Sequence, residues 1–331
     1  MPGTSFSPQT LRRIELTTAV RDTDRIPKVA NAGDVIRHRG VPVQVMHCGV
    51  VVERDCYYGA WMTEVIRRLR GHHEPQEEAV FYELVERLRR DTPEPVMLEL
   101  GSYWAYYTLW LKKVQPDATC LLVEPDPHHL EVGRRNLALN DIGGRFIHAA
   151  AAREHGQQIR LRCESDSRVR KVPTISVDGL LANEPIGHID MLVCDVQGAE
   201  LDVLRGARAA MRDQRLRFMV ISTHLMSEAP TLHQRCLALL QNAGAHIIAE
   251  HSIPESCSVD GLIVASFDPR DRDFSVTITI GRARDSLGGE VEWRLERALG
   301  WRGFARQLLR PLLRFPRLRA IAARAGSVAD R

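Results

Sequence analysis

The chain has 331 residues, of which 44% are hydrophobic and 26% charged, a composition typical of a globular protein with one sizeable core. No apolar run reaches the roughly 18 residues of a membrane-spanning helix, and the opening MPGTSFSPQTLRR lacks the apolar stretch of a signal peptide. The seven cysteines form no CxxC pair, which speaks against a disulfide framework or a zinc knuckle and favours a reducing cytoplasm.

Residues 1–92 predict an N-terminal α+β extension. Its short strand-like segments are VPVQVM and GVVVE, and they precede two helical stretches, AWMTEVIRRLR and EEAVFYELVERLRR. The second helix should end before the Pro-rich DTPEP, because proline cannot continue a helix.

Residues 93–268 alternate between apolar strands and helices. The predicted strands are VMLEL (96–100), ATCLLVE (118–124), RFIHAAA (145–151), HIDMLVCD (188–195), RFMVIST (217–223), AHIIAEH (245–251) and DGLIVASF (260–267), and the first helix should run from about Tyr103 to Val114, the fourth from about Gly198 to Met211. Such alternation predicts an α/β protein with a doubly wound, Rossmann-like parallel sheet and helices on both faces. The last two strands are joined too closely for a crossover, so the last strand should be reversed. A mostly parallel sheet with a reversed last strand is the arrangement of class I methyltransferases.

Residues 269–331 form a third zone, with a strand-like FSVTITI (274–280) and a basic tail. Residues 270–331 hold 14 Lys and Arg against 7 Asp and Glu, although the net charge of the whole chain is only +3. Arg and Leu recur at helical intervals in this tail. Its simplest interpretation is a solvated segment or an oligomer contact, and the second is an amphipathic segment at an anionic inner membrane surface. No nucleic-acid partner is predicted, because no recognition module is present.

The turn after the first strand, ELGSYWA, lacks the GxGxxG glycines that let a dinucleotide pyrophosphate rest on the backbone. Gly101 still permits a sharp turn and a close approach by a ligand. The turn suits a ligand with an amine and an adenosine but no phosphate, such as S-adenosylmethionine, with Glu99 binding the ammonium group. Glu124 ends the second strand, where an acid can accept hydrogen bonds from both ribose hydroxyls.

Four blocks of sequence together resemble the FkbM-type methyltransferases over roughly residues 72–267: ELGSYWAYYTLWL, VEPDPHHLEVGRRNLALN, VPTISVDGLL and IDMLVCDVQGAELDVLRGA. The resemblance implies an S-adenosylmethionine-dependent enzyme that O-methylates a sugar, glycosylated or polyketide-type small molecule. Ala105 replaces the third glycine usual in the family, and Gln197 replaces the glutamate of its D-x-E-G motif. The predicted cofactor-binding residues are Glu99, Gly101, Ser102, Tyr103, Glu124, Asn140, Ala150 and Asp195.

Polar side chains should gather at the carboxyl edge of the sheet, next to the cofactor. Asp195 and His224 follow the fourth and fifth strands, and we predict them as the catalytic residues, His224 having the better ordinary pKa for a general base. Gln197, His251 and Asp260 are expected to contact the substrate or support the site. Two alternatives stay open: Asp195 and His224 could share a divalent metal with a substrate diol, or these residues could only bind cofactor and cap helices.

The aromatic residues after Gly101 are expected to roof the site. Tyr103 lies on the turn, where it can reach cofactor or substrate, whereas Trp104, Tyr106 and Tyr107 should pack the N-terminal extension against the sheet. The rival functions are an NAD-linked oxidoreductase, which the turn and the reversed strand disfavour, and a non-enzymatic binding module. We predict a cytoplasmic enzyme that acts on a small molecule and is able to form an oligomer.

Overall fold

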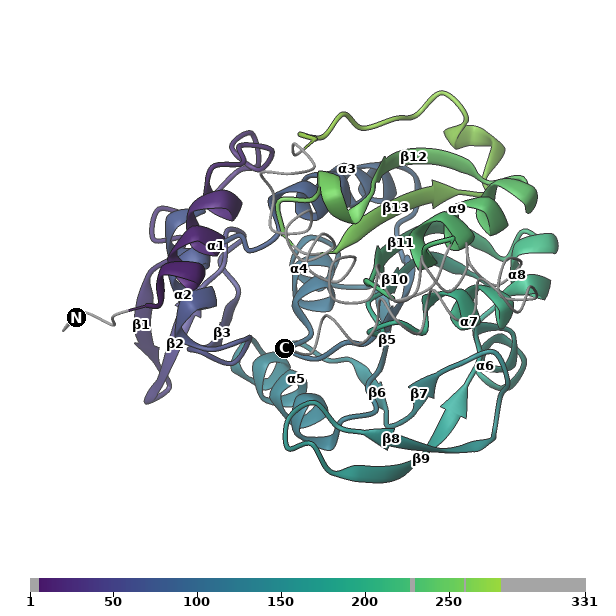
Figure 1. Cartoon of the computed structure of the whole chain (residues 1–331), viewed down its shortest axis with the longest axis horizontal. Coiled ribbons are helices and arrows are strands. Elements are labelled where there is room, and N and C mark those ends of the chain that lie inside the picture. Colours follow the sequence, from purple (N-terminus) through teal and green to yellow (C-terminus); the bar gives the residue numbers. More distant parts are fainter. Residues whose placement is uncertain (1–5, 227–229, 259, 281–331) are drawn as a thin grey trace, which may run out of the picture.

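A computed structural model describes residues 6–226, 230–258 and 260–280. Figure 1 shows a central sheet flanked by helices, with a smaller N-terminal sheet on one side and a β-hairpin on the other. The basic helical segment that prompted the prediction of a membrane or oligomer contact, residues 293–326 of the zone 269–331, lies outside the described residues. Within them, no helix is long and apolar enough to span a membrane.

The central sheet has seven strands in the order β12-β13-β11-β10-β4-β5-β6. They are β4 (Val96–Leu100), β5 (Thr119–Val123), β6 (Arg145–Ile147), β10 (Ile189–Cys194), β11 (Leu216–Thr223), β12 (His246–His251) and β13 (Gly261–Ser266). β13 lies between β11 and β12 and is antiparallel to both, whereas the other strand pairs of this sheet are parallel. The predicted topology is therefore confirmed, because the short link through η1 (Ile253–Glu255) allows only a reversal.

Helices cover both faces of this sheet (Figure 1). α3 (Pro75–Asp91), α4 (Tyr106–Val114) and α5 (Pro127–Leu139) share one apolar cluster, and α6 (Val177–Asn183), α7 (Glu200–Arg205), α8 (Arg208–Arg212) and α9 (Leu232–Asn242) share the other. Neighbouring strand residues point to opposite faces, so Met97 belongs to the first cluster and Leu98 to the second. Apolar residues along β4 are buried on both faces, as expected for a central parallel strand.

The N-terminal extension consists of α1 (Pro8–Thr18), a three-stranded antiparallel sheet and α2 (Ala60–Arg68). The strands are β1 (Val35–His38), β2 (Val41–Val45) and β3 (Val51–Glu53). The next helix, α3, packs its Phe81 and Leu84 in the same cluster as Met97 and Phe218 of the central sheet, and that cluster also contains Met62 of α2.

Several predicted boundaries differ from the structure. The segment 145–151 divides between β6 and β7 (Ala150–Ala151), and β7 pairs with β9 (Val169–Ile175), which forms a hairpin with β8 (Gln158–Arg162). The helix predicted at 198–211 breaks around Gly206, where the backbone approaches so closely that an added Cβ would lie 2.6 Å from the carbonyl oxygen of Ala152. The strand predicted at 274–280 is wrong: after η2 (Pro269–Asp271) this segment makes single backbone bonds, such as that from Val276 to Ile248, instead of a ladder.

Candidate active site

The turn after β4 is held between two strands. The backbone N–H of Gly101 donates to the carbonyl of Val123, 2.9 Å away, and that of Asp195 donates to Leu100 at 3.0 Å. Gly101 has a φ of +77°, and a Cβ on it would lie only 1.7 Å from the carbonyl oxygen of Asp195. Glycine is thus required here for both its conformation and its size.

Two further positions of this turn adopt left-handed backbone conformations without being glycine. Tyr103 has a φ of +34° and Ala105 a φ of +62°, a region that costs an L-residue about 1–2 kcal/mol. α4 therefore begins at Tyr106, three residues later than predicted. Ala105 is completely buried, so its methyl group fits, as its replacement of glycine required.

Glu99 and Glu124 are buried carboxylates at the ends of neighbouring strands. Glu99 accepts hydrogen bonds from the backbone and side chain of Thr108, and Glu124 accepts from the backbone N–H groups of Tyr103 and Asp126 at 3.0 and 2.8 Å. Burial raises the pKa of each carboxyl to about 7. Each carboxylate oxygen can accept a second hydrogen bond, so both acids still have capacity for a ligand.

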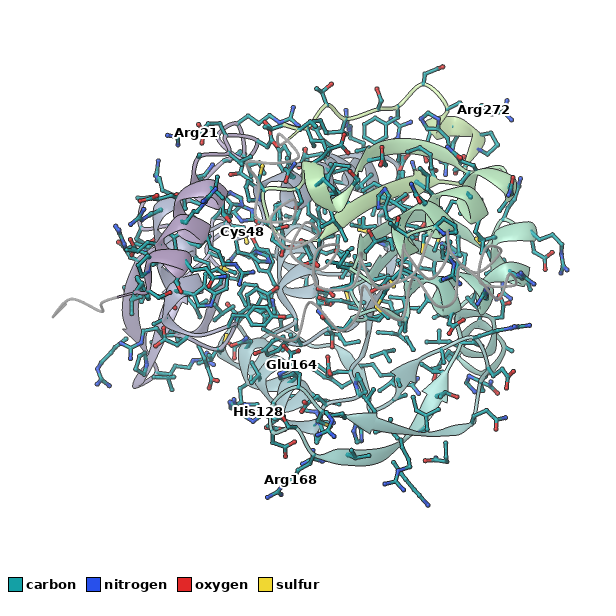
Figure 2. The ribbon with its side chains drawn as sticks, in the orientation of Figure 1. Arg21, Cys48, His128, Glu164, Arg168 and Arg272 are labelled. Atoms are coloured by element: carbon teal, nitrogen blue, oxygen red, sulfur yellow. The ribbon has the colours of Figure 1, made fainter. Side chains whose placement is uncertain are left out.

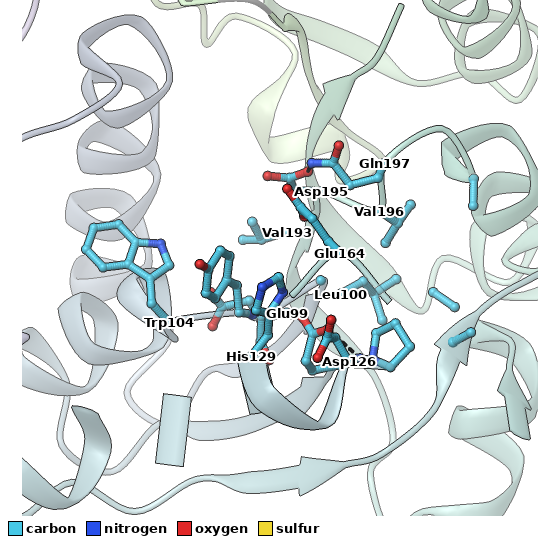
Figure 3. A pocket seen from close by; sticks show the side chains of 18 of the residues that line it. Glu99, Leu100, Trp104, Asp126, His129, Glu164, Val193, Asp195, Val196 and Gln197 are labelled. Carbon is cyan, nitrogen blue, oxygen red and sulfur yellow. Dashed lines mark hydrogen bonds between the residues drawn. The ribbon is translucent and has the colours of Figure 1, made fainter. Parts of the chain in front are cut away.

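These residues line a cavity of about 400 Å³, called the large cavity below, which is the size of a small-molecule site. Its wall includes Glu99, Gly101, Ser102, Tyr103, Glu124, Ala150, Asp195 and Gln197. The Oγ of Ser102 is buried there without a hydrogen-bond partner among the described residues, which is expected where a ligand supplies one. Figure 3 shows Asp195 and Gln197 on one side of this cavity, Trp104 opposite, and Glu99, Asp126 and His129 between them.

Asn140 is the exception among the predicted cofactor-binding residues. It does not line the large cavity; its side-chain amide accepts from the backbone N–H of Val51 and donates to the carbonyls of Val51 and Asn136. It therefore anchors β3 of the N-terminal extension to the end of α5, a contact that spacing along the sequence gave no reason to expect.

His224 lies among three carboxylates. Its Nδ1 is 2.7 Å from Glu200, and its Nε2 is 3.2 Å from Asp195 and 3.6 Å from Asp260. Burial would lower the pKa of His224, but the hydrogen bond to Glu200 and the charges of Asp195 and Asp260 raise it well above its usual value. The imidazole is thus held as a cation, which corrects the reason for predicting it as the better base: a charged ring has no free lone pair.

Asp195 borders a second cavity of about 200 Å³, called the side cavity below. It lies between the N-terminal extension and the carboxyl edge of the sheet, and its wall includes Arg13, Tyr57, Tyr58, Trp61, Glu74, Asp195, Gln197, His224 and Asp260. Asp195, Gln197, Glu74 and the two tyrosines line both cavities, so the two are adjacent. Of the other predicted support residues, Asp260 lines the side cavity, whereas His251 lies behind it, beside a hollow of about 10 Å³.

Two distant segments contribute residues to the walls of the two cavities, and neither segment was predicted to do so. Tyr57 stacks on Trp104 with ring centroids 4.5 Å apart, and Tyr58 and Trp61 continue this aromatic wall. On the opposite side, the hairpin of β8 and β9 brings Glu164 to the large cavity; Figure 2 shows Glu164 on the inner side of the hairpin and Arg168 pointing outward. Neither segment carries a motif, so no local signal identified them.

Trp104, Tyr106 and Tyr107 also have separate roles. Trp104 and Tyr107 line the large cavity. The buried hydroxyls of Tyr106 and Tyr107 donate to Glu78 and Glu77 of α3 at 2.7 and 2.6 Å. The last two residues therefore tie α4 to α3, close to the packing role predicted for them.

A metal ion at Asp195 and His224 is not supported by the geometry. Among the described residues, the group whose potential ligand atoms lie close enough together is His47, His72 and Glu78. There Glu78 already accepts from His72 and Tyr106, and the rings of His47 and His72 stack at 4.2 Å. We interpret this group as a buried hydrogen-bond network that joins the N-terminal extension to α3 and α4.

The order of the strands, with β13 reversed, defines a class I methyltransferase fold. The turn after β4 suits a ligand that has no phosphate groups. Residues 94–247 match the family model described as the methyltransferase FkbM domain. The match confirms the predicted resemblance to FkbM-type methyltransferases, over a somewhat shorter segment than the predicted 72–267.

The chain is similar to solved structures of methyltransferases at low sequence identity. A precorrin-6y C5,15-methyltransferase from Geobacter metallireducens is 12% identical, with a TM-score of 0.35, over 56% of this chain and 86% of its own. The human METTL16 N-terminal domain in complex with SAH is 12% identical (TM-score 0.39; 59% and 71% covered), and M. capricolum TrmK in complex with S-adenosyl-homocysteine is 12% identical (TM-score 0.36; 60% and 74% covered). No curated protein sequence matches this chain. The fold assignment rests on the strand order described above.

Proposed function

We propose that this protein is an S-adenosylmethionine-dependent O-methyltransferase that acts on a hydroxyl of a sugar, glycosylated or polyketide-type small molecule. The observation that carries the proposal is the position of Asp195, which lines both the large cavity and the side cavity. A residue at that boundary can touch both reactants of a group transfer.

The residues of the large cavity fit the cofactor. Glu99 supplies a carboxylate for the ammonium group, Glu124 supplies acceptors for the ribose hydroxyls, and the unpartnered Ser102 hydroxyl is available for a further hydrogen bond. When bound, the cofactor supplies an electrophilic methyl group on a positively charged sulfur. The turn that holds it has side chains where a dinucleotide needs bare backbone, which disfavours the NAD-linked alternative.

The chain's own residues would then orient the acceptor and take its proton. Asp195 accepts the proton of the attacking hydroxyl as the oxygen–methyl bond forms and the carbon–sulfur bond breaks. His224, held by Glu200, fixes the orientation of Asp195 through its Nε2. The aromatic wall of Tyr57, Tyr58 and Trp61 offers flat apolar surface to a ring and excludes water from one side of the acceptor.

Calorimetric titration with S-adenosylhomocysteine and with NAD, each with and without EDTA, tests the cofactor. The expected result is binding of S-adenosylhomocysteine alone, unaffected by EDTA. Binding of NAD, or of neither ligand, would refute the proposal, and the second outcome would favour the binding-module alternative. Transfer of a tritiated methyl group to a panel of monosaccharides and glycosides then tests the acceptor class.

A further inference from the structure

The side cavity has more negative charge than its own cations neutralise. Glu74, Asp195 and Asp260 face it, and the charges of Glu77 and Glu200 act on Asp260 as well. The cations on its wall are Arg13 and His224. A polar cavity with an unmet charge is a site for a ligand of the opposite sign.

Neither cation satisfies Glu74. The guanidinium of Arg13 lies 4.9 Å above the ring of Trp61 and forms no ion pair in the described part of the chain. His224 is already shared by Asp195, Glu200 and Asp260. The carboxylate of Glu74 has only the Nε2 of His73 nearby, at 3.9 Å, and it accepts no hydrogen bond from any described residue.

The environment of these acids agrees with the geometry. Burial, together with the charges of Glu77 and Asp260, raises the pKa of Glu74 well above its usual value, and burial raises the pKa of Asp260 to about 6. Glu74 therefore lacks a positive partner, whereas the charge of His224 lowers the pKa of Asp260 without offsetting the effect of burial. The buried Nε2 of His224 lies 3.2 Å from Asp195 but is not aligned for a hydrogen bond to any described residue. As a donor, this N–H can bind the hydroxyl oxygen of a ligand, not its ammonium group.

The cofactor's sulfonium cannot neutralise both acids. Glu74 lines both cavities, but Asp260 lines the side cavity and not the large cavity, so Asp260 faces the acceptor side of the site. A metal ion is also a poor candidate, because Glu74 and Asp260 belong to no group of described ligand atoms with metal-binding spacing. The remaining wall is aromatic, and aromatic faces attract organic cations as well as sugar rings.

We propose that the acceptor carries an ammonium group that binds against Glu74 and Asp260 in the side cavity, so that the methylated hydroxyl beside Asp195 belongs to an amino sugar or a similar amino alcohol. This inference rests on the proposed function. The hydroxyl oxygen takes the methyl group from the sulfonium, its proton passes to Asp195, and the ammonium group keeps its protons and is not methylated.

The test compares matched sugars on protein saturated with S-adenosylhomocysteine. Binding of D-glucosamine, D-galactosamine and D-mannosamine is measured by calorimetry against each N-acetylated form and each neutral hexose. A charge-assisted pair with Glu74 should make at least one amino sugar bind roughly ten- to a hundredfold tighter than its N-acetylated form and the corresponding neutral hexose. This preference should weaken at high salt.

Glu74→Gln should abolish that preference. Because Glu74 also lines the large cavity, a titration of the variant with S-adenosylhomocysteine checks that the cofactor site is retained. The side chain of Glu74 makes no capping bond in α3, so the helix should be retained. Asp260→Asn is the second variant, and Glu86→Gln, on the same helix and paired only with Arg89 at the surface, is the matched control that should behave like the wild type.

Equal binding of amines and their partners, or no binding of any sugar, would overturn the inference while S-adenosylhomocysteine still binds. A preference that survives both Glu74→Gln and Asp260→Asn would overturn it as well. Loss of S-adenosylhomocysteine binding in the wild type would instead refute the proposed function, and this inference with it.

Discussion

Gly101→Ala should destabilise the protein far more than an otherwise similar glycine substitution. Gly101 and Gly156 have nearly the same backbone conformation, with φ of +77° and +75°, so alanine pays about 1–2 kcal/mol of left-handed strain at either position. At Gly101 the new Cβ would also lie 1.7 Å from the carbonyl oxygen of Asp195, whereas at Gly156 nothing lies within 4 Å. Forcing the ends of β4 and β10 apart adds about 1–3 kcal/mol.

Urea denaturation of the two variants, followed by tryptophan fluorescence, separates the two effects. Gly156→Ala measures the strain alone, and the additional loss in Gly101→Ala measures the clash, since the conformational cost is shared. Gly101→Ala should also weaken S-adenosylhomocysteine binding, because the displaced carbonyl belongs to a residue on the cavity wall. Equal losses of unfolding free energy in both variants would show that the turn and β10 are not in close contact.

The other predictions concern the site and its supports. Asp195→Asn should lower the methyl-transfer rate by about 10²- to 10⁴-fold with S-adenosylhomocysteine affinity retained within a few-fold; a rate near that of the wild type would remove Asp195 from the mechanism. Asn140→Ala should cost about 1–3 kcal/mol in a urea titration, because it leaves the buried N–H of Val51 without an acceptor, and a large loss of cofactor affinity at unchanged stability would instead restore its predicted role in binding. Glu99, whose pKa burial raises from 4.5 to about 7, keeps its proton in the folded protein over a range where the unfolded chain loses it. The unfolding free energy of the wild type should therefore fall relative to that of Glu99→Gln as the pH rises from 4.5 to 7, and a difference that stays constant with pH would contradict this.

The sequence predicted the central sheet correctly for identifiable physical reasons. Strands such as VMLEL are apolar except for the acid near the ligand-binding end, because helices cover both faces of a parallel sheet. The short link before β13 left only an antiparallel return. The predicted cofactor residues Glu99, Gly101 and Glu124 follow directly from this, since strand ends converge at one edge of the sheet. The alternation of apolar residues in FSVTITI predicted a strand, and this prediction was wrong. Such alternation is compatible with any extended segment that buries one side.

The second half of the site came from parts of the chain that carry no motif. Tyr57, Trp61 and Glu74 reach the side cavity because the N-terminal extension folds back against the sheet, and Asn140 holds it there through β3. Val51 and Asn140 are 89 positions apart, and Tyr57 and Asp260 of the side cavity are about 200 positions apart. Periodicity reports only on neighbours two to four positions away.

The sequence by itself therefore determined the class of fold, the phosphate-free turn and the acids at the strand ends, because these depend on local patterns of burial and backbone freedom. The tertiary structure alone decided the charge state of His224 and the shape of the side cavity. Burial and the approach of Asp195, Glu200 and Asp260 set the pKa of that imidazole, and desolvation and charge pairing exist only after distant segments have packed together.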